Sequence, residues 1–233
     1  MKCHVKFIQI IYQDILMTNV LGIDTGMKNL GLCVMNNSEI LLWDVFNILE
    51  DDVLYCTKEG CSVKAKWKPG VLCGRHYKGA KETKYAVKQK KCSSYTPEQL
   101  ATCVSKLFTN LFSDNEEIFK NINLVVFELQ PRINQRAKMM SHFIYMKICD
   151  YIVTNGLKCK MKFERASCKL KNFKGDKGLY VKNTYTNRKK KSVEYTKQIL
   201  EDYDPKWLES LESMSKKDDA CDALLISYNN CRA

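Results

Sequence analysis

The sequence predicts an α/β domain, a five-stranded sheet flanked by helices, that is interrupted by a small insertion containing cysteines and a histidine. Two apolar runs of the kind that form buried central strands each end in a carboxylate, at Asp24 and Glu128. Helical apolar spacing recurs downstream, between and after the later strands. Residues 50–94, in contrast, are rich in Lys, Gly and Cys and lack apolar periodicity, which is typical of a separate small unit.

The first three strands are predicted before the insertion. Residues 20–23 are apolar and end at Asp24, and a second apolar strand leads to Val34. Between and within these strands, Gly26 and Gly31 indicate either a hairpin bend or a backbone that approaches another element closely. Residues 39–49 supply the third strand.

Strands and helices alternate after the insertion. Thr96 can cap a helix that begins at Pro97, and Gln99 would complete a capping box. The remaining predicted elements are a strand at 122–128, a helix at 134–154, a half-exposed edge strand at 157–163, a basic loop at 166–187, a helix at 188–200 and a final helix at 216–228.

The chain therefore divides into one discontinuous domain, at 17–49 and 95–233, and an insertion at 50–94. Residues 1–16 form an N-terminal extension, and Met17 is a possible start of translation. This extension lacks a small-residue cleavage site, so we do not interpret it as a signal peptide. The twelve cysteines are scattered, several within apolar stretches, which favours free thiols in a reducing intracellular compartment.

The net charge of +12 is concentrated in two stretches. Residues 64–91 hold ten Lys or Arg against one Glu, and residues 158–191 hold thirteen against two acids. Dense basic blocks indicate a polyanionic partner, whereas a solvated lysine face better explains scattered charge. No run of 18 apolar residues occurs, so neither a transmembrane helix nor a membrane partner is expected.

The insertion contains two closely spaced pairs of candidate metal ligands. Cys56 and Cys61 are followed, after eleven residues, by Cys73 and His76. Three thiolates and an imidazole favour a closed tetrahedral Zn²⁺ site, whose ion would supply folding energy that so short a segment lacks. Four protein ligands leave no open position, so the predicted zinc is structural. The alternative is a loop with unrelated thiols, in which Cys92 is a further candidate ligand.

Four acids are candidates for a second metal site. Asp219 and Asp222 are three apart and share one face of the final helix, although acids in a first helical turn ordinarily complement the dipole. Asp24 and Glu128, at the ends of two strands, could face them. Such a cluster repels itself unless cations lie between the carboxylates, and oxygen ligands select Mg²⁺ or Mn²⁺. Two such ions are the usual apparatus of phosphodiester hydrolysis.

Three motifs together resemble the RuvC-type Holliday junction resolvases, most closely the fungal mitochondrial and poxvirus branches of the RNase H-like superfamily. The motifs are Gly22-Ile23-Asp24-Thr25-Gly26 with Asn29, Phe127-Glu128-x-Gln130-x-x-Arg132, and Lys216-Lys217-Asp218-Asp219-x-x-Asp222-Ala223. The resemblance implies an RNase H-like fold with a mixed sheet, a homodimer, and Mg²⁺-dependent paired nicking of four-way DNA junctions that leaves 5′-phosphates. The Cys/His insertion departs from the simpler resolvases.

The resemblance also implies roles for particular residues. Asp24, Glu128, Asp219 and Asp222 become the catalytic, metal-binding set, with Asp218 as an alternative to Asp219. Lys189, Lys190, Lys191 and Arg132 become the candidate DNA-binding residues. A viral factory in the host cytoplasm, a mitochondrion and a nucleus all provide reducing conditions and DNA, so the sequence does not distinguish these compartments.

Three other classes of protein also fit parts of the sequence. Transposon-type or RNA-guided nucleases share the Gly-Ile-Asp-x-Gly strand, but they usually place a zinc module after the Glu strand. An actin-like ATPase would need a second lobe and a second phosphate loop, neither of which is found. A non-catalytic zinc-containing DNA-binding module would leave the carboxylates at two strand ends unexplained. A junction resolvase is therefore the preferred interpretation.

Overall fold

The sheet is built from strands on both sides of the insertion. The computed structural model describes residues 18–37, 39–49, 55–63, 65, 67–68, 71–77, 85–86, 92–131, 133–171, 184–214 and 216–231. The five strands of the main sheet are β1 (Asn19–Thr25), β2 (Asn29–Met35), β3 (Ile40–Asn47), β6 (Ile122–Glu128) and β7 (Lys160–Glu164). The predicted extension at 1–16 lies outside the described residues.

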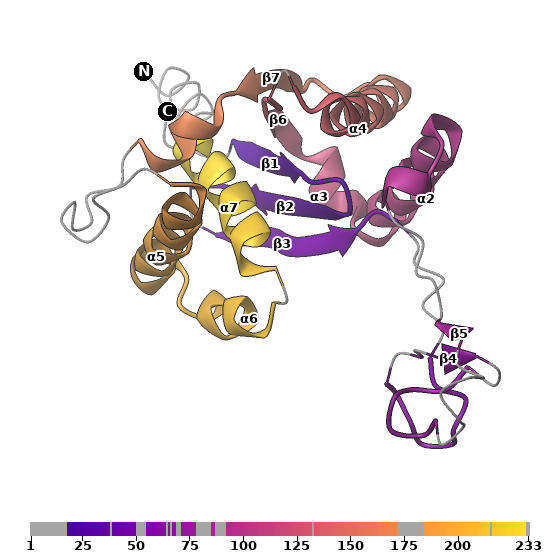
Figure 1. Ribbon diagram of the computed structural model, residues 1–233. Coiled ribbons are helices and arrows are strands. Elements are labelled where there is room, and N and C mark those ends of the chain that lie inside the picture. Colours follow the sequence, from indigo (N-terminus) through magenta and orange to yellow (C-terminus); the bar gives the residue numbers. More distant parts are fainter. Residues whose placement is uncertain are drawn as a thin grey trace, which may run out of the picture.

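The strand order is β3-β2-β1-β6-β7. β1, β2 and β3 pair antiparallel as a meander, whereas β6 runs parallel to both β1 and β7. The sheet is therefore mixed, and with its flanking helices it has the RNase H-like α/β architecture that the sequence predicts (Figure 1). The central strands β1 and β6 are largely buried, as their unbroken apolar runs require.

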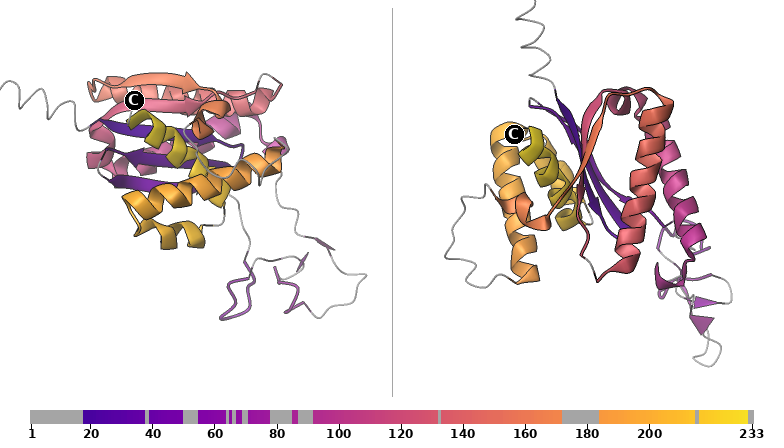
Figure 2. Two further views of the ribbon diagram at one scale, coloured as in Figure 1. Left: turned by 90° about the vertical axis from the view of Figure 1, so that its left-hand side faces the viewer. Right: turned by 90° about the horizontal axis from the view of Figure 1, so that it is seen from above.

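Helices cover both faces of this sheet (Figure 2). α2 (Pro97–Asp114) and α4 (Gln135–Thr154) pack on one face, and α5 (Tyr185–Tyr203) and α7 (Lys217–Cys231) cover the other. Two short helices connect longer elements along the chain: α3 (Glu116–Lys120) follows α2, and α6 (Trp207–Ser213) lies between α5 and α7 in the sequence. None of the described helices is both long and apolar enough to cross a membrane.

The two faces of β1 enter different clusters of the hydrophobic core. Leu21 and Ile23 pack toward α2 and α4, while Val20 packs with residues of α5 and α7. Side chains alternate along a strand, so Asp24 projects toward the α7 face with Val20. The same alternation applies to β6, where Val126 belongs to the α7 cluster and Glu128 follows two residues later. The sheet thus directs both carboxylates toward α7.

Two glycines allow α7 to lie directly on the sheet. A Cβ at Gly22 would lie 2.5 Å from the carbonyl oxygen of Ala223, and one at Gly31 would overlap the carbonyl oxygen of Asp219. Gly31 therefore marks a close backbone approach, one of its two predicted roles, whereas Gly26 lies in the hairpin, where its N–H bonds to the Asn29 carbonyl at 3.0 Å.

Most predicted elements are confirmed, with changes at their ends. Thr96 and Gln99 form the predicted capping box around a helix that begins at Pro97. The loop prediction for 166–187 is wrong at both ends, because Ala166–Leu170 forms a 3₁₀ helix, η3, and α5 begins at Tyr185. Residues 172–183 of that loop lie outside the described residues.

The insertion contains little regular structure among its described residues. β4 (Trp67–Lys68) and β5 (Tyr85–Ala86) form a two-stranded sheet, and η2 (Cys92–Ser94) precedes α2. β4 and β5 are drawn apart from the main sheet in each view (Figures 1 and 2). Two strands of two residues each bury little surface, so the backbone alone gives this unit little stability.

Candidate active site

Three carboxylates from distant parts of the chain converge on the α7 face of the sheet. Ile23 and Phe127 are register partners in the parallel β1–β6 pair, which places Asp24 beside Glu128 at the strand ends. Asp222 comes from α7, the helix that crosses β1 and β2. One carboxylate oxygen from each of the three residues lies within 4.8 Å of the other two. Three of the four predicted catalytic acids therefore form one group.

A buried lysine lies among these carboxylates. The Nζ atom of Lys169, on η3, is 2.5 Å from Asp222 Oδ2, 3.0 Å from Glu128 Oε2 and 3.8 Å from Asp24 Oδ1. Its side chain is only 8% exposed. Burying an ammonium is costly unless it is paired, and here three acids pair with it. The site therefore already stabilises a cation at its centre.

The protonation of the group follows from burial and from this charge balance. Burial raises the pKa of Asp24 well above its usual range, and the adjacent Glu128 and Asp222 carboxylates raise it further, although Lys169 opposes them. Burial would also raise the pKa of Glu128, but its hydrogen bonds with Asp24 and Lys169 lower that pKa overall. Of these two neighbouring carboxyl groups, Asp24 therefore holds a proton more readily than Glu128 does.

Although burial disfavours its charge, the carboxylates of Asp24, Asp222 and Glu128 raise the pKa of Lys169 above its ordinary value. Lys169 is therefore charged at neutral pH and places a positive charge between the carboxylates. Because every surrounding ligand atom is a carboxylate oxygen, the residues fit a hard divalent ion such as Mg²⁺ or Mn²⁺.

Asp222 is oriented by two other elements. The hydroxyl of Ser192, which lies on α5 and is 2% exposed, donates a hydrogen bond to Asp222 Oδ1 while Lys169 bonds to Oδ2. Sequence reasoning missed both partners. Nothing local distinguishes Lys169 from Lys171 in the basic stretch, and Ser192 is one of several polar residues on an amphipathic helix.

The remaining predicted acids lie beside this group rather than in it. Asp219 is outside the three-carboxylate group, and its Oδ2 accepts a hydrogen bond from Asn29 Nδ2 at 3.4 Å. Burial, followed by the neighbouring charge of Asp218, raises the pKa of Asp219. Asp218 forms an ion pair with Lys189 instead. Among the described residues, Asp218 is thus the acid bonded to a lysine, whereas Asp219 is bonded to the Asn29 amide.

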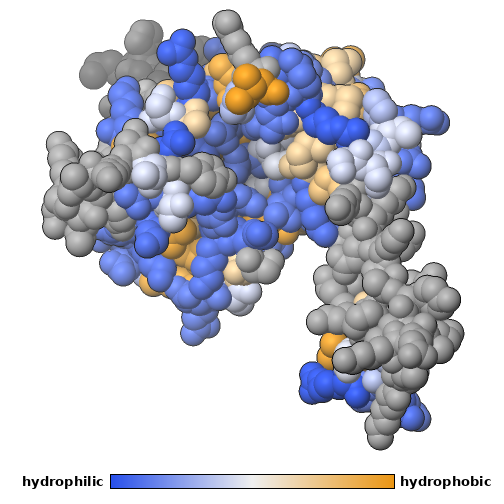
Figure 3. Space-filling model, in the orientation of Figure 1, coloured by the Kyte–Doolittle hydropathy of each residue, from blue (hydrophilic) through white to orange (hydrophobic). Residues whose placement is uncertain are grey.

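The predicted DNA-binding lysines on α5 border a groove. This groove has a volume of about 600 Å³ and lies between α5 and the start of α7. The face that carries α5 and α7 is predominantly hydrophilic (Figure 3). Lys189 and Lys190 line the groove, Lys191 does not, and Arg132 lies outside the described residues. The residues that line it are Thr186, Lys189, Lys190, Val193, Glu194, Lys197, Lys217 and Asp218.

The four predicted zinc ligands also come together, in the insertion rather than on the sheet. One ligand atom from each of Cys56, Cys61, Cys73 and His76 lies within 4.8 Å of the other three. This group is separate from the carboxylates in both sequence and chemistry.

No protein-family model matches the chain, and no curated protein matches it either. Among solved structures, it is similar to RuvC from Thermus thermophilus, both alone and in complex with a Holliday junction substrate. Each similarity has 12% identity and a TM-score of 0.46, and covers 92% of this chain and 95% or 96% of RuvC. At this TM-score the similarity identifies neither a reaction nor its residues.

Proposed function

We propose that this protein is a metal-dependent endonuclease that resolves four-way DNA junctions by paired phosphodiester hydrolysis. The observation that carries the proposal is the convergence of Asp24, Glu128 and Asp222 around a buried cation, next to a groove lined by lysines. The carboxylates account for the chemistry, and the groove and basic stretches account for a nucleic-acid substrate. The choice of a junction rests on the sequence motifs.

The carboxylates of Asp24, Glu128 and Asp222 would hold two Mg²⁺ or Mn²⁺ ions, with Asp219 as a fourth ligand. Such ions supply an activated water and stabilise negative charge on the leaving oxygen. The protein holds the carboxylates on rigid strands and a packed helix, so little reorganisation is needed when ions bind. Lys169 would leave the centre of the group, and its ammonium would then be available to a DNA phosphate.

The lysine-lined groove gives the DNA backbone a path next to the carboxylates. Lys190, Lys197 and Lys217 line this groove together with the ion pair of Lys189 and Asp218. Lysines act as point charges on phosphates and contribute affinity without reading sequence. Such binding suits an enzyme that recognises the shape of its DNA.

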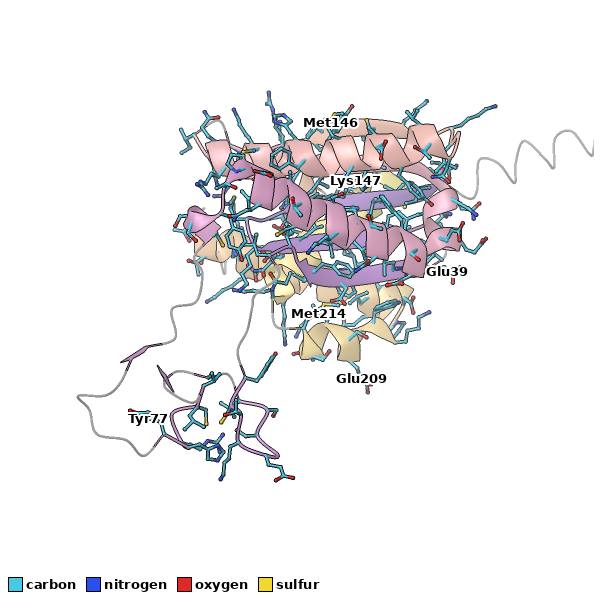
Figure 4. All side chains as sticks on the ribbon, turned by 90° about the vertical axis from the view of Figure 1, so that its right-hand side faces the viewer. Glu39, Tyr77, Met146, Lys147, Glu209 and Met214 are labelled. Carbon is cyan, nitrogen blue, oxygen red and sulfur yellow. The ribbon has the colours of Figure 1, made fainter. Side chains whose placement is uncertain are left out.

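Paired nicking requires two active sites, so we propose a homodimer. The apolar stripe of α4, including Met140 and Ile144, packs into the core and is not available to a partner. The outer face of α4 instead exposes Met146, which is 62% exposed (Figure 4). One heptad further along α4, Val153 is 79% exposed. Exposed apolar side chains on one helix face are consistent with a partner surface.

A cleavage assay on three labelled DNAs of matched sequence tests the proposal. The substrates are a four-way junction, a duplex and a single strand, each with Mg²⁺ or with EDTA. The variants are Asp24→Asn and Asp202→Asn, the second being an exposed carboxylate on α5 that serves as a matched control. We expect symmetric nicks in the junction only, lost with EDTA and in Asp24→Asn by on the order of 10³-fold, and retained in Asp202→Asn.

Each other outcome has a definite meaning. Cutting of duplex or single strands, with the same dependence on Mg²⁺ and Asp24, would support a different RNase H-like nuclease. Tight junction binding without cutting under any condition would support a non-catalytic DNA-binding protein. Full activity of Asp24→Asn would show that the carboxylate group is not the active site.

A further inference from the structure

We infer that Cys56, Cys61, Cys73 and His76 hold one structural Zn²⁺ ion and that His76 binds it through Nδ1. The inference goes beyond the proposed nuclease activity, because it concerns a separate unit of the chain. The spacing of the cysteines suggests zinc, but the distances between the ligand atoms identify the ligand set and the imidazole nitrogen.

The distances match those of a tetrahedral zinc site. With Zn–S bonds of about 2.3 Å and Zn–N bonds of about 2.0–2.1 Å, tetrahedral geometry separates two sulfurs by about 3.8 Å, and a sulfur from a nitrogen by about 3.5 Å. The Sγ atoms of Cys61 and Cys73 are 4.0 Å apart. His76 Nδ1 is 3.3 Å from Cys56 Sγ and 3.6 Å from Cys73 Sγ. The four atoms therefore surround a space of the size that zinc fills.

Tight backbone turns hold the ligands in place. The Cys61 N–H bonds to the Lys58 carbonyl at 3.0 Å, and the His76 N–H bonds to the Cys73 carbonyl at 3.2 Å. These turns keep the members of each ligand pair, Cys56 with Cys61 and Cys73 with His76, close together in space.

The donor set selects the ion. Three thiolates and an imidazole are soft or borderline ligands that favour Zn²⁺ over Mg²⁺ or Mn²⁺, the reverse of the carboxylate group. Cys61 and Cys73 are free thiols, so a disulfide does not account for their proximity. Four protein ligands close the coordination sphere, and the ion would therefore be structural rather than catalytic.

The unit has little else to stabilise it. Among the described residues of 55–77, the buried side chains are those of Cys56, Ala65 and Cys73, and two of these three are proposed ligands. In Figure 4, the label of Tyr77, the residue directly after His76, locates this unit, which is drawn away from the helices. A segment without an apolar core depends on its metal for folding.

Metal analysis of the full-length protein tests the inference. The purified chain is desalted into metal-free buffer without a chelator to remove loosely bound ions, and its zinc is then measured by mass spectrometry. We expect about one zinc per chain in the wild type, in Asp24→Asn and in Cys92→Ser, and none in Cys73→Ser. Cys92 is the matched control, because it is the cysteine of the insertion that lies outside the ligand group.

Two further variants keep the test decisive if Cys73→Ser does not fold. Cys61→His replaces one zinc ligand by another, so it should keep zinc but with weaker affinity. Exchange of Zn²⁺ for Co²⁺ should produce the intense visible bands of tetrahedral Co²⁺ with thiolate ligands, and His76→Gln should shift them. Absence of zinc from the wild type, loss of zinc in Cys92→Ser, or Co²⁺ bands that His76→Gln leaves unchanged would overturn the inference.

Discussion

The carboxylate group and the Cys/His unit both gather metal ligands, but they do so by opposite means. Asp24, Glu128 and Asp222 come from two strands and a helix at distant points of the chain, and the hydrophobic core brings them together. The four ligands of the Cys/His unit all lie within residues 56–76 and are joined by short turns. The carboxylate group therefore depends on the tertiary structure, whereas the Cys/His group depends on local turns within one short segment.

The difference extends to what each site needs from a metal. In the body of the protein, Lys169 pairs with the carboxylates, so we expect this part of the chain to fold before a divalent ion binds. The described residues of the Cys/His unit bury almost no core, so we expect its order to depend on the proposed zinc ion. We expect metal to change the activity of the first and the folding of the second.

Replacing Lys169 should have the largest effect on the stability of the body. Lys169→Ala leaves three partly buried carboxylates without their cation, which should lower the free energy of unfolding by roughly 3–5 kcal/mol. Mg²⁺ should restore part of this loss. Urea unfolding with and without Mg²⁺ measures both effects, with the exposed Lys171→Ala as control. Equal stability of the two variants would contradict the role of Lys169 as internal cation.

Replacing Ser192 should weaken metal binding rather than folding. Ser192→Ala removes the hydroxyl that orients Asp222 Oδ1, and the loss of such an orienting partner lowers metal affinity by about 10–100-fold. The Mg²⁺ concentration that gives half-maximal cleavage should rise accordingly, while the rate at saturating Mg²⁺ stays close to wild type. If that rate falls and the Mg²⁺ requirement does not change, Ser192 has a different role.

The metal-free Asp24→Asn protein should be more stable than the wild type at neutral pH. Because the folded-state pKa of Asp24 is raised, the folded protein holds this proton more tightly than the unfolded chain does. Wild-type stability therefore falls as pH rises from about 4, the unfolded carboxyl value, through the raised pKa. Asparagine has no such dependence, so its advantage should grow across that window to roughly 0.5–2 kcal/mol.

Thermal melting without Mg²⁺ at a series of pH values measures this difference. The Asp202→Asn protein, which lacks only an exposed carboxylate, should follow the wild type at each pH. An advantage of Asp24→Asn that shrinks as pH rises would have the wrong sign for a raised pKa.

A change in a turn of the Cys/His unit should have an effect that is confined to that unit. Gly60 has a positive φ of 71° and open space where a Cβ would lie, so Gly60→Ala is strained by about 1–2 kcal/mol without a steric clash. Since folding and zinc binding are coupled there, zinc affinity should fall by about tenfold. Competition with a chromogenic chelator measures this affinity. A lowered melting temperature of the body would show that the two regions are not independent.

The elements that carry the site could be predicted because their signals are local. An apolar pattern within each segment identifies its secondary structure. This holds for the strand with Asp24, the strand with Glu128 and the final helix with Asp222. The spacing of Cys56, Cys61, Cys73 and His76 is also a local signal, since short turns determine which residues can meet.

Lys169, Ser192 and the distinction between Asp218 and Asp219 could not be predicted. Lys169 lies in a basic stretch that reads as a solvated loop, and its burial depends on η3 packing against α7. Ser192 meets Asp222 only because α5 lies along α7. Such contacts join residues that have no fixed spacing in the sequence, so a periodic pattern of residues cannot predict them.

The sequence by itself determined the class of the fold, the carboxylates at the strand ends and the cluster of three cysteines and a histidine in the insertion, because backbone periodicity and short turns are local properties. Only the tertiary structure decided which acids meet and which cation lies between them. The geometry of that group depends on the close approach of α7 to Gly22 and Gly31 and on the burial of Lys169. These are properties of packing between distant segments, where sterics and desolvation act on the assembled protein.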